Sequence, residues 1–412
     1  MTAGRDDADP HDTPTARAFI LELGRGLHEA GAPSHRIEDA MSVLAQRLGV
    51  TGQFFTTPTS IFASFGPPEE QRTALLRVEP AGVNLERLSL LDDLIREVEE
   101  GRREPEDAIV RLRAIGTAPD RYGPLLSIAC FGFSAAAVAR FLGGGWPEIG
   151  AAAAIGLQTG VLAQLAARRP AVARVFEWVA ALGAALAALV WAALIGPLVP
   201  LNAALSGLIV LVPGLSLAVA FTELSTRNLV SGTARLAGAA MTILAIGFGL
   251  ALGSRLQPLV GAAALSMPRA PLPPWTEWLA LAVSPFALAV LFRARPRDIA
   301  MVLAACVMAF VIARAGARMG GSEVGVLAAA FAVGVTGNLY GRFLRQPAAV
   351  PVVPALVMLL PASLGVRSIA TLLLARDVVS GMELAFTLVV LAMALAAGLL
   401  LANLVVPPRR AL

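Results

Sequence analysis

The chain has little charge and contains no lysine. Only 15% of its 412 residues are charged, against about 25% in an average soluble domain. All 33 basic residues are arginine, which we attribute to genome composition rather than to chemistry. Because 57% of the residues are hydrophobic, the composition excludes an ordinary soluble protein and predicts an all-α polytopic membrane protein.

Cysteine, histidine and nucleotide-binding motifs are also scarce. Cys130 and Cys306 fall in apolar stretches, so we expect neither a disulfide framework nor a zinc site. The spacing of His28, His35 and Glu38 fits no common metal-ligand pattern, and the sequence holds no phosphate-binding loop. We therefore expect no metal, no cofactor, no catalytic residues and no ATP-driven transport.

The few charges are distributed unevenly along the chain. Residues 1–122 carry 14 arginines and 21 acidic residues, whereas residues 123–412 carry 19 arginines and 8 acidic residues. The two parts have net charges of −7 and +11. The basic character of the second part is typical of arginines that flank membrane helices, and we do not interpret it as nucleic-acid binding.

The acidic part of the chain predicts a small soluble domain. Residues 1–16 have the composition of a disordered tail and lack the features of a signal peptide. Residues 17–122 predict a cytoplasmic α/β domain, in which Ser34 caps the second helix. The expected elements are helices near 19–30, 37–48, 85–98 and 105–115 and strands at 54–65 and 73–78.

The rest of the chain contains ten apolar stretches, most of them long enough to cross a bilayer. We place them in a first membrane half at 123–253 and a second at 276–405, joined by a proline-rich linker at 254–275 and followed by a cytoplasmic tail at 406–412. The stretches are 125–142, 149–167, 175–195, 202–222, 229–252, 276–292, 299–314, 322–341, 350–373 and 378–402. The seventh is marginal in length.

Arginine counts in the connecting loops predict the orientation. With both termini in the cytoplasm, the inner loops carry 11 arginines and the outer loops carry 7, as the positive-inside rule favours. Five spans in each half is an odd number. The second half must then insert upside down relative to the first, which makes an inverted-topology repeat.

Proline interrupts apolar stretches at matching places in the two halves. Pro213-Gly214 precedes Ser231-Gly232, and Pro361 precedes Ser380-Gly381, with 18 and 19 residues from proline to serine. A broken helix frees backbone polar groups, which are tolerated at membrane depth only where they are buried in protein or line a cavity. Paired interruptions therefore predict a substrate site, although a simple kink is the alternative at each proline.

Ionisable side chains near these interruptions are the candidates for binding substrate or protons. Arg235 and Glu383 occupy nearly equivalent places in the two halves, and we predict that they face each other near the repeat axis. Snorkelling towards the membrane surface is the alternative for both. Charges just after the broken helices are further candidates, with solvated loops as the alternative: Glu223, Arg227, Arg376 and Asp377.

Several segments resemble the threonine/serine exporter family. They read Gly-Ala-Pro-Ser-His-Arg-Ile-Glu at 31–38, Thr-Pro-Thr-Ser-Ile at 57–61, Leu-Val-Pro-Gly at 211–214 and Val-Ser-Gly-Thr-Ala-Arg-Leu at 230–236. The resemblance covers about residues 17–405. The second half departs from the family, because Pro361 is followed by alanine where the family commonly has glycine.

The resemblance implies a proton-coupled antiporter that exports threonine and serine across the bacterial inner membrane. In such a transporter, Arg235 or helix N-termini would bind the substrate carboxylate, and Glu383 or freed backbone carbonyls would bind the ammonium group. Glu383, Glu223 and Asp377 are the candidates for carrying protons.

Two other functions remain open. A dicarboxylate exporter is the alternative among transporters, and a membrane-embedded enzyme acting through the soluble domain is the alternative from another class. The sequence leaves a homo-oligomer open.

Overall fold

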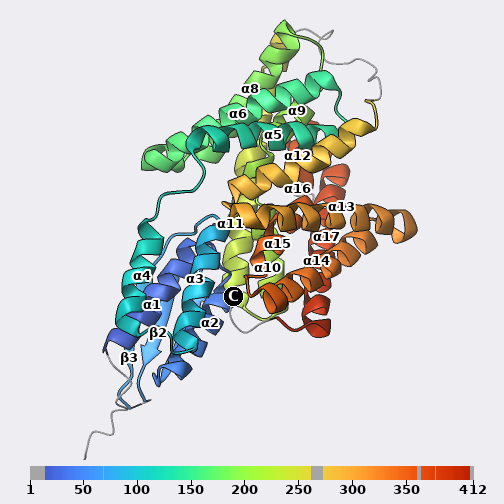
Figure 1. The fold of residues 1–412 in the computed structure, drawn as a ribbon. Coiled ribbons are helices and arrows are strands. Elements are labelled where there is room, and N and C mark those ends of the chain that lie inside the picture. The colour runs from blue at the N-terminus through green and yellow to red at the C-terminus, as the bar shows by residue number, and fades with distance from the viewer. Residues whose placement is uncertain (1–13, 68, 261–271, 360–362, 376, 409–412) are drawn as a thin grey trace, which may run out of the picture.

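The protein consists of a small α/β unit and a larger helical part, as the computed structural model shows (Figure 1). The structure describes residues 14–67, 69–260, 272–359, 363–375 and 377–408. The N-terminal unit comprises four helices and three strands up to residue 117, and the helical part begins at residue 124. Residues 1–13 of the predicted tail 1–16 and the centre of the predicted linker, 261–271, lie outside the described residues. Residues 14–16 belong to the first helix, so the predicted tail is wrong at that end.

The N-terminal unit packs its helices against a three-stranded antiparallel sheet in the order β1-β2-β3. The predicted single strand at 54–65 is wrong, because the chain turns at Pro58-Thr59 and forms a hairpin. The hydroxyls of Thr57 and Ser60 lie 2.8 Å apart across this turn. The elements are α1 (Pro14–Glu29), α2 (Ser34–Arg47), β1 (Gly52–Thr57), β2 (Ser60–Phe65), β3 (Arg72–Arg77), α3 (Leu85–Glu99) and α4 (Pro105–Thr117).

The core of this unit comes from the predicted apolar faces of its helices. Phe19, Leu23 and Leu27 of α1 are completely buried, as are Met41 and Leu44 of α2. Each such side chain contributes about 1.5–3 kcal/mol when it leaves water. The unit therefore has its own hydrophobic core, which fixes the position of the α2 N-terminus.

The helical part contains the membrane-spanning candidates. Its α-helices are α5 (Pro124–Phe141), α6 (Trp146–Arg168), α7 (Pro170–Ala173), α8 (Phe176–Leu194), α9 (Pro200–Gly207), α10 (Gly214–Ser225), α11 (Leu229–Ser254), α12 (Trp275–Leu291), α13 (Ile299–Gly320), α14 (Ser322–Leu344), α15 (Ala349–Leu359), α16 (Ser363–Ala370) and α17 (Val378–Val405). Short turns add η1 (Ile209–Leu211), η2 (Gln257–Val260), η4 (Pro296–Asp298) and the π-helical η5 (Thr371–Ala375).

Eight described helices are long and apolar enough to cross a membrane, and the bent pair α9–α10 makes nine. At 17 residues, α12 is a shorter apolar helix. Helix α13 extends to Gly320 and is therefore longer than the marginal seventh stretch predicted. The ten spans and the inverted repeat stay predictions.

The helical part buries small residues and exposes large ones. A β-carbon added to Gly253 of α11 would lie 2.4 Å from the Ala185 Cβ of α8, and one added to Gly249 would lie 2.7 Å from the Ala181 Cβ. On the outside of α11, half of the Phe248 surface is exposed. Small residues allow membrane helices to approach closely, while large apolar residues face lipid.

Helices that run towards the N-terminal unit end in arginines with a left-handed backbone. Among the described non-glycine residues, φ is positive at Arg227 (66°), Arg293 (55°) and Arg345 (52°), which follow α10, α12 and α14. After Arg227 and Arg293, the next amide donates to a carbonyl five residues back, at 2.8 Å in both cases. This Schellman geometry satisfies the last carbonyls of the helix and usually has glycine at the left-handed position.

The N-terminal unit contacts the α12–α13 loop through backbone and side chains. The Leu85 amide donates to the Phe292 carbonyl at 2.9 Å, and the Tyr122 hydroxyl donates to the Ala294 carbonyl at 2.7 Å. Because α3 begins at Leu85, its first amide is satisfied by the helical part. These bonds therefore fix the position of the N-terminal unit relative to the α12–α13 loop.

Candidate functional site

The predicted interruption at Pro213-Gly214 is present. Helices α9 and α10 are bent by 54°, and the turn η1 lies between them. Pro213 has no amide hydrogen, and it lies at the N-cap of α10 with Gly214 as the first helical residue. A β-carbon added to Gly207 would lie 2.3 Å from the Cγ2 of Ile155. Close contact with α6 therefore holds the break in place.

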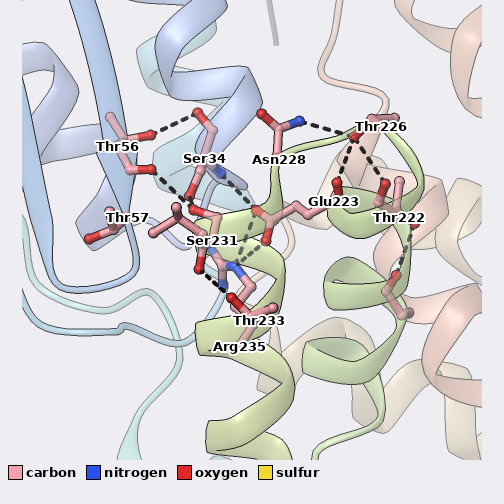
Figure 2. Close-up of polar contacts among 12 residues, drawn as sticks. Ser34, Thr56, Thr57, Thr222, Glu223, Thr226, Asn228, Ser231, Thr233 and Arg235 are labelled. Carbon is pink, nitrogen blue, oxygen red and sulfur yellow. Dashed lines mark hydrogen bonds and ion pairs between the residues drawn. The ribbon is translucent and has the colours of Figure 1, made fainter.

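Glu223, near the end of α10, is the centre of a buried polar cluster (Figure 2). Its side chain is completely buried. The Nε atom of Arg235 on α11 lies 3.1 Å from Oε2 and 3.2 Å from Oε1, and only the second contact has hydrogen-bond geometry. The backbone amide of Ser34 also donates to Oε1 at 3.2 Å. A buried carboxylate thus joins two membrane helices to the N-terminal unit.

A chain of hydroxyl contacts continues from this carboxylate to the sheet. Ser231, on α11, lies 2.6 Å from the Ser34 hydroxyl and donates to the Thr56 carbonyl at 3.1 Å. The Thr56 hydroxyl donates to the Ser34 carbonyl at 3.0 Å, and its amide donates to Glu38 Oε1 at 2.6 Å. Figure 2 shows these side chains between β1, α2 and α11. The predicted cap by Ser34 is therefore wrong, because Ser34 is the first helical residue and bonds across the interface.

The two Ser-Gly segments have glycines in matching roles and serines with different partners. Gly232 allows the α10–α11 turn to close, since a β-carbon there would lie 2.7 Å from the Leu224 Cγ, and a β-carbon added to Gly381 would likewise lie 2.6 Å from the Leu372 Cγ. In the second copy, Asp377 caps α17 by accepting hydrogen bonds from the Ser380 amide at 3.1 Å and hydroxyl at 2.6 Å. The Gly381 carbonyl accepts from the Ser368 hydroxyl at 2.6 Å.

The remaining predicted residues lie elsewhere. Arg227 is exposed in the α10–α11 turn, and Glu383 is exposed on α17. The structure pairs Arg235 with Glu223 and shows no ion pair between Arg235 and Glu383. Pro361 and Arg376 lie outside the described residues. In the described part of the second interrupted segment, Arg367 of α16 donates to the Asn202 side chain of α9 at 3.1 Å.

A cavity of about 270 Å³ lies beside the Glu223 cluster. It is bounded by the start of α2, by α10 and α11, and by α14, α15 and α17, so that both parts of the protein contribute. Most of its wall is apolar. Its polar and charged lining residues are His35, Arg36, Ser216, Thr222, Arg235, Asn338 and Asn403. The volume is slightly below the roughly 300–1,000 Å³ of drug-sized sites and suits a small solute.

The histidines next to the cluster are held neutral. Burial, followed by the positive charges of Arg36 and Arg235, lowers the pKa of His35 to about 4. Burial and Arg235 also lower the pKa of His28, against hydrogen bonding to Pro58 and Thr57. Burial raises the pKa of Glu38, while hydrogen bonds from Thr56 oppose that shift. The surroundings of Arg235 therefore disfavour further positive charge on the protein.

Acid is expected to destabilise the protein through His35. Between about pH 6.5 and pH 4 the unfolded chain binds a proton at this position and the folded chain does not, so stability falls as pH falls. The loss reaches about 3 kcal/mol below pH 4. Thermal unfolding at several pH values, compared with a His35→Asn variant, measures the difference. Equal pH dependence in the two proteins would contradict this assignment.

The sequence pointed to Glu223, Ser231 and Arg235, but not to their partners from the N-terminal unit. Ser34 and Glu223 are 189 residues apart, so no spacing rule relates them. The one signal was the density of polar residues in the segment 31–38, directly before an apolar helical face. When polar side chains at the start of a helix are buried, they require hydrogen-bond partners from elsewhere in the fold.

Two family models match the chain. The model described as "Putative threonine/serine exporter" matches residues 18–257, and the model described as "Threonine/Serine exporter, ThrE" matches residues 277–405. No solved structure matches.

The curated relatives include fungal proteins named "Pheromone-regulated membrane protein 10". Those from Kluyveromyces lactis, Debaryomyces hansenii and Saccharomyces cerevisiae are 28%, 29% and 26% identical over 86%, 86% and 95% of this chain. The chain spans 38%, 36% and 54% of their respective lengths.

Proposed function

Because the chain belongs to the threonine/serine exporter family, we propose that it is a secondary transporter that exports threonine and serine in exchange for protons. In this proposal it lies in the inner (plasma) membrane, with its N-terminal unit and both termini in the cytoplasm. The cavity between the N-terminal unit and α10 then opens from the side on which the solute is collected. Its dimensions suit an amino acid of this size.

The observation that carries the proposal is the buried Glu223–Arg235 pair at the end of the interrupted α9–α10 segment. An ion pair buried in a membrane protein is costly and is characteristic of ion and proton pathways. A proton arriving at Glu223 would neutralise the carboxylate and leave Arg235, which lines the cavity, without its counter-charge. The added positive charge would repel the ammonium group of the solute, and a bound ammonium group would in turn oppose protonation of Glu223. Such mutual exclusion of proton and solute is what proton-coupled antiport requires.

Efflux measurements test the proposal. Cells are loaded with labelled threonine through a dipeptide, with and without this protein, and the loss of label is followed with and without an uncoupler. We expect faster efflux with the protein, and we expect the uncoupler to abolish the difference. Unchanged efflux of both threonine and serine would contradict the assigned substrates.

A dicarboxylate exporter is the second candidate, because the cavity is lined by two arginines, Arg36 and Arg235. Two cations at suitable separation can bind the two carboxylates of a succinate-like solute. The same assay with labelled succinate distinguishes the two candidates. Efflux of succinate without efflux of threonine would select the dicarboxylate.

A further inference from the structure

The positive charge that lines the cavity is not fully balanced by nearby negative charge. It is lined by two guanidinium groups, and no carboxylate is among its described lining residues. Arg235 is paired with Glu223. The side chain of Arg36, in contrast, makes no hydrogen bond and no ion pair within 4.0 Å in the part of the chain that the structure describes. The acid that acts on it is Asp39, which is exposed one turn further along α2.

The position of Arg36 within its helix increases this imbalance. It is the third residue of α2, and the first turn of that helix contains no acidic residue. The N-terminus of a helix carries a partial positive charge and favours anions. A cation is therefore unfavourable here, and a bound anion would offset both the helix end and the arginine. Arginine remains protonated in proteins, so deprotonation is not an alternative.

A second polar group in the cavity also lacks a partner. The Nδ1 atom of His35 is buried without a hydrogen bond among the described residues. Arg36 and Arg235 line the same cavity as this imidazole, and the charges of both lower its pKa. A neutral imidazole in a cavity with two guanidinium groups adds a polar ring nitrogen without adding charge.

The opposite wall of the cavity is mostly apolar, with amide groups from two helices. Val352 and Leu356 of α15 and Leu399 of α17 line it, and the Asn338 amide donates to Asn403 at 2.9 Å. Such a site combines a charged end, which binds an anionic group, with an apolar end that excludes water. The two ends come from different parts of the protein.

We propose that Arg36 and His35 of the N-terminal unit, together with Arg235 of α11, form the subsite that binds the carboxylate of the transported solute. The proposal deepens the function proposed above and rests on its premise that the solute is a carboxylate. It makes the N-terminal unit part of the binding site. Arg36 takes the carboxylate while Arg235 stays paired with Glu223 and adds its positive charge to the wall of the same cavity.

Binding to the purified full-length protein tests the subsite directly. The probes are L-threonine, L-threoninol, which lacks the carboxylate, and succinate, each measured by calorimetry at pH 7. In Arg36→Gln, we expect the Kd for the carboxylate ligand to rise about 10- to 100-fold, because one charge-assisted hydrogen-bonding partner is lost. Arg36→Lys keeps the positive charge and loses the planar guanidinium group, so its Kd should lie between those of the wild type and of Arg36→Gln. The matched control is Arg25→Gln on the exposed face of α1, which should bind as the wild type does.

The outcomes separate this inference from the proposed function. Unchanged Kd for threonine and succinate in Arg36→Gln would overturn the subsite, even if wild-type cells export threonine. A carboxylate-dependent loss of binding in that variant would support it, even if neither solute is exported. Tighter binding of threoninol than threonine by the wild type, or binding of none of the three probes, would overturn it as well. A melting temperature of the ligand-free Arg36→Gln protein at or above that of Arg25→Gln shows that weaker binding is not caused by unfolding, because removing an uncompensated cation should not destabilise the fold.

Discussion

Replacing Arg235 with methionine is expected to abolish efflux and to lower the free energy of unfolding by about 3–5 kcal/mol. The change leaves the completely buried Glu223 carboxylate without its cation. An uncompensated buried charge is the main cause of such large losses, and the remaining amide of Ser34 replaces only part of the interaction. Efflux of labelled threonine and thermal unfolding of the purified protein measure the two effects.

A double variant separates the structural and functional contributions of this pair. Glu223→Leu with Arg235→Met removes both charges, and apolar replacement of a buried pair is often neutral for stability. We expect the double variant to regain most of the lost melting temperature and to remain inactive. Glu323→Gln, at the exposed start of α14, is the matched control and should export normally. Normal export by the double variant would remove the pair from the mechanism.

Replacing Ser34 with proline is expected to separate the N-terminal unit from α10 and α11 and to reduce efflux strongly. Proline has no amide hydrogen, so the bond to Glu223 is lost together with the hydroxyl contact to Ser231. The backbone tolerates the change, since proline is favoured at the first position of a helix. The preceding Pro33 has φ −65° and ψ 150°, which suits a residue before proline. Loss of a donor to a buried carboxylate costs about 1–3 kcal/mol.

Hydrogen exchange of α2 and α11 measures the separation. Both segments should exchange faster in Ser34→Pro than in the wild type. Ser34→Ala is the matched control, because it removes the hydroxyl and keeps the amide that donates to Glu223. Its effect should be clearly smaller. Equal effects of the two substitutions would show that the amide contact does not hold the interface.

Sequence predicted α5 and α11 closely because each is a long apolar stretch bounded by charge or proline. Helix α5 covers Pro124–Phe141 against a predicted 125–142, and α11 covers Leu229–Ser254 against 229–252. The predicted stretch 202–222 is instead divided between α9, η1 and α10.

The same method joined β1 and β2, because Thr57 and Ser60 continue a strand-like run across the turn. Pro58 was the signal against a continuous strand, since proline cannot donate to a strand ladder and favours turns.

The site was predicted less completely, because its contacts depend on the arrangement of the whole fold. Counting from each Ser-Gly placed Arg235 opposite Glu383, on the assumption that the two halves use equivalent residues. The pairing with Glu223 depends instead on the close α10–α11 turn at Gly232, which brings residues 12 apart together. The partners in the N-terminal unit lie at least 175 residues away in the sequence, and local patterns do not predict where this unit packs against the helical part.

The arginines that end α10, α12 and α14 have a consequence for how the chain is made. A left-handed backbone costs an arginine roughly 1–2 kcal/mol, and glycine would adopt it freely. Positive charge beside a membrane helix decides which way the helix inserts during synthesis. The residues that terminate these three helices thus also carry the information that orients them. Glycine would end each helix with less backbone strain but would remove one of the charges beside it.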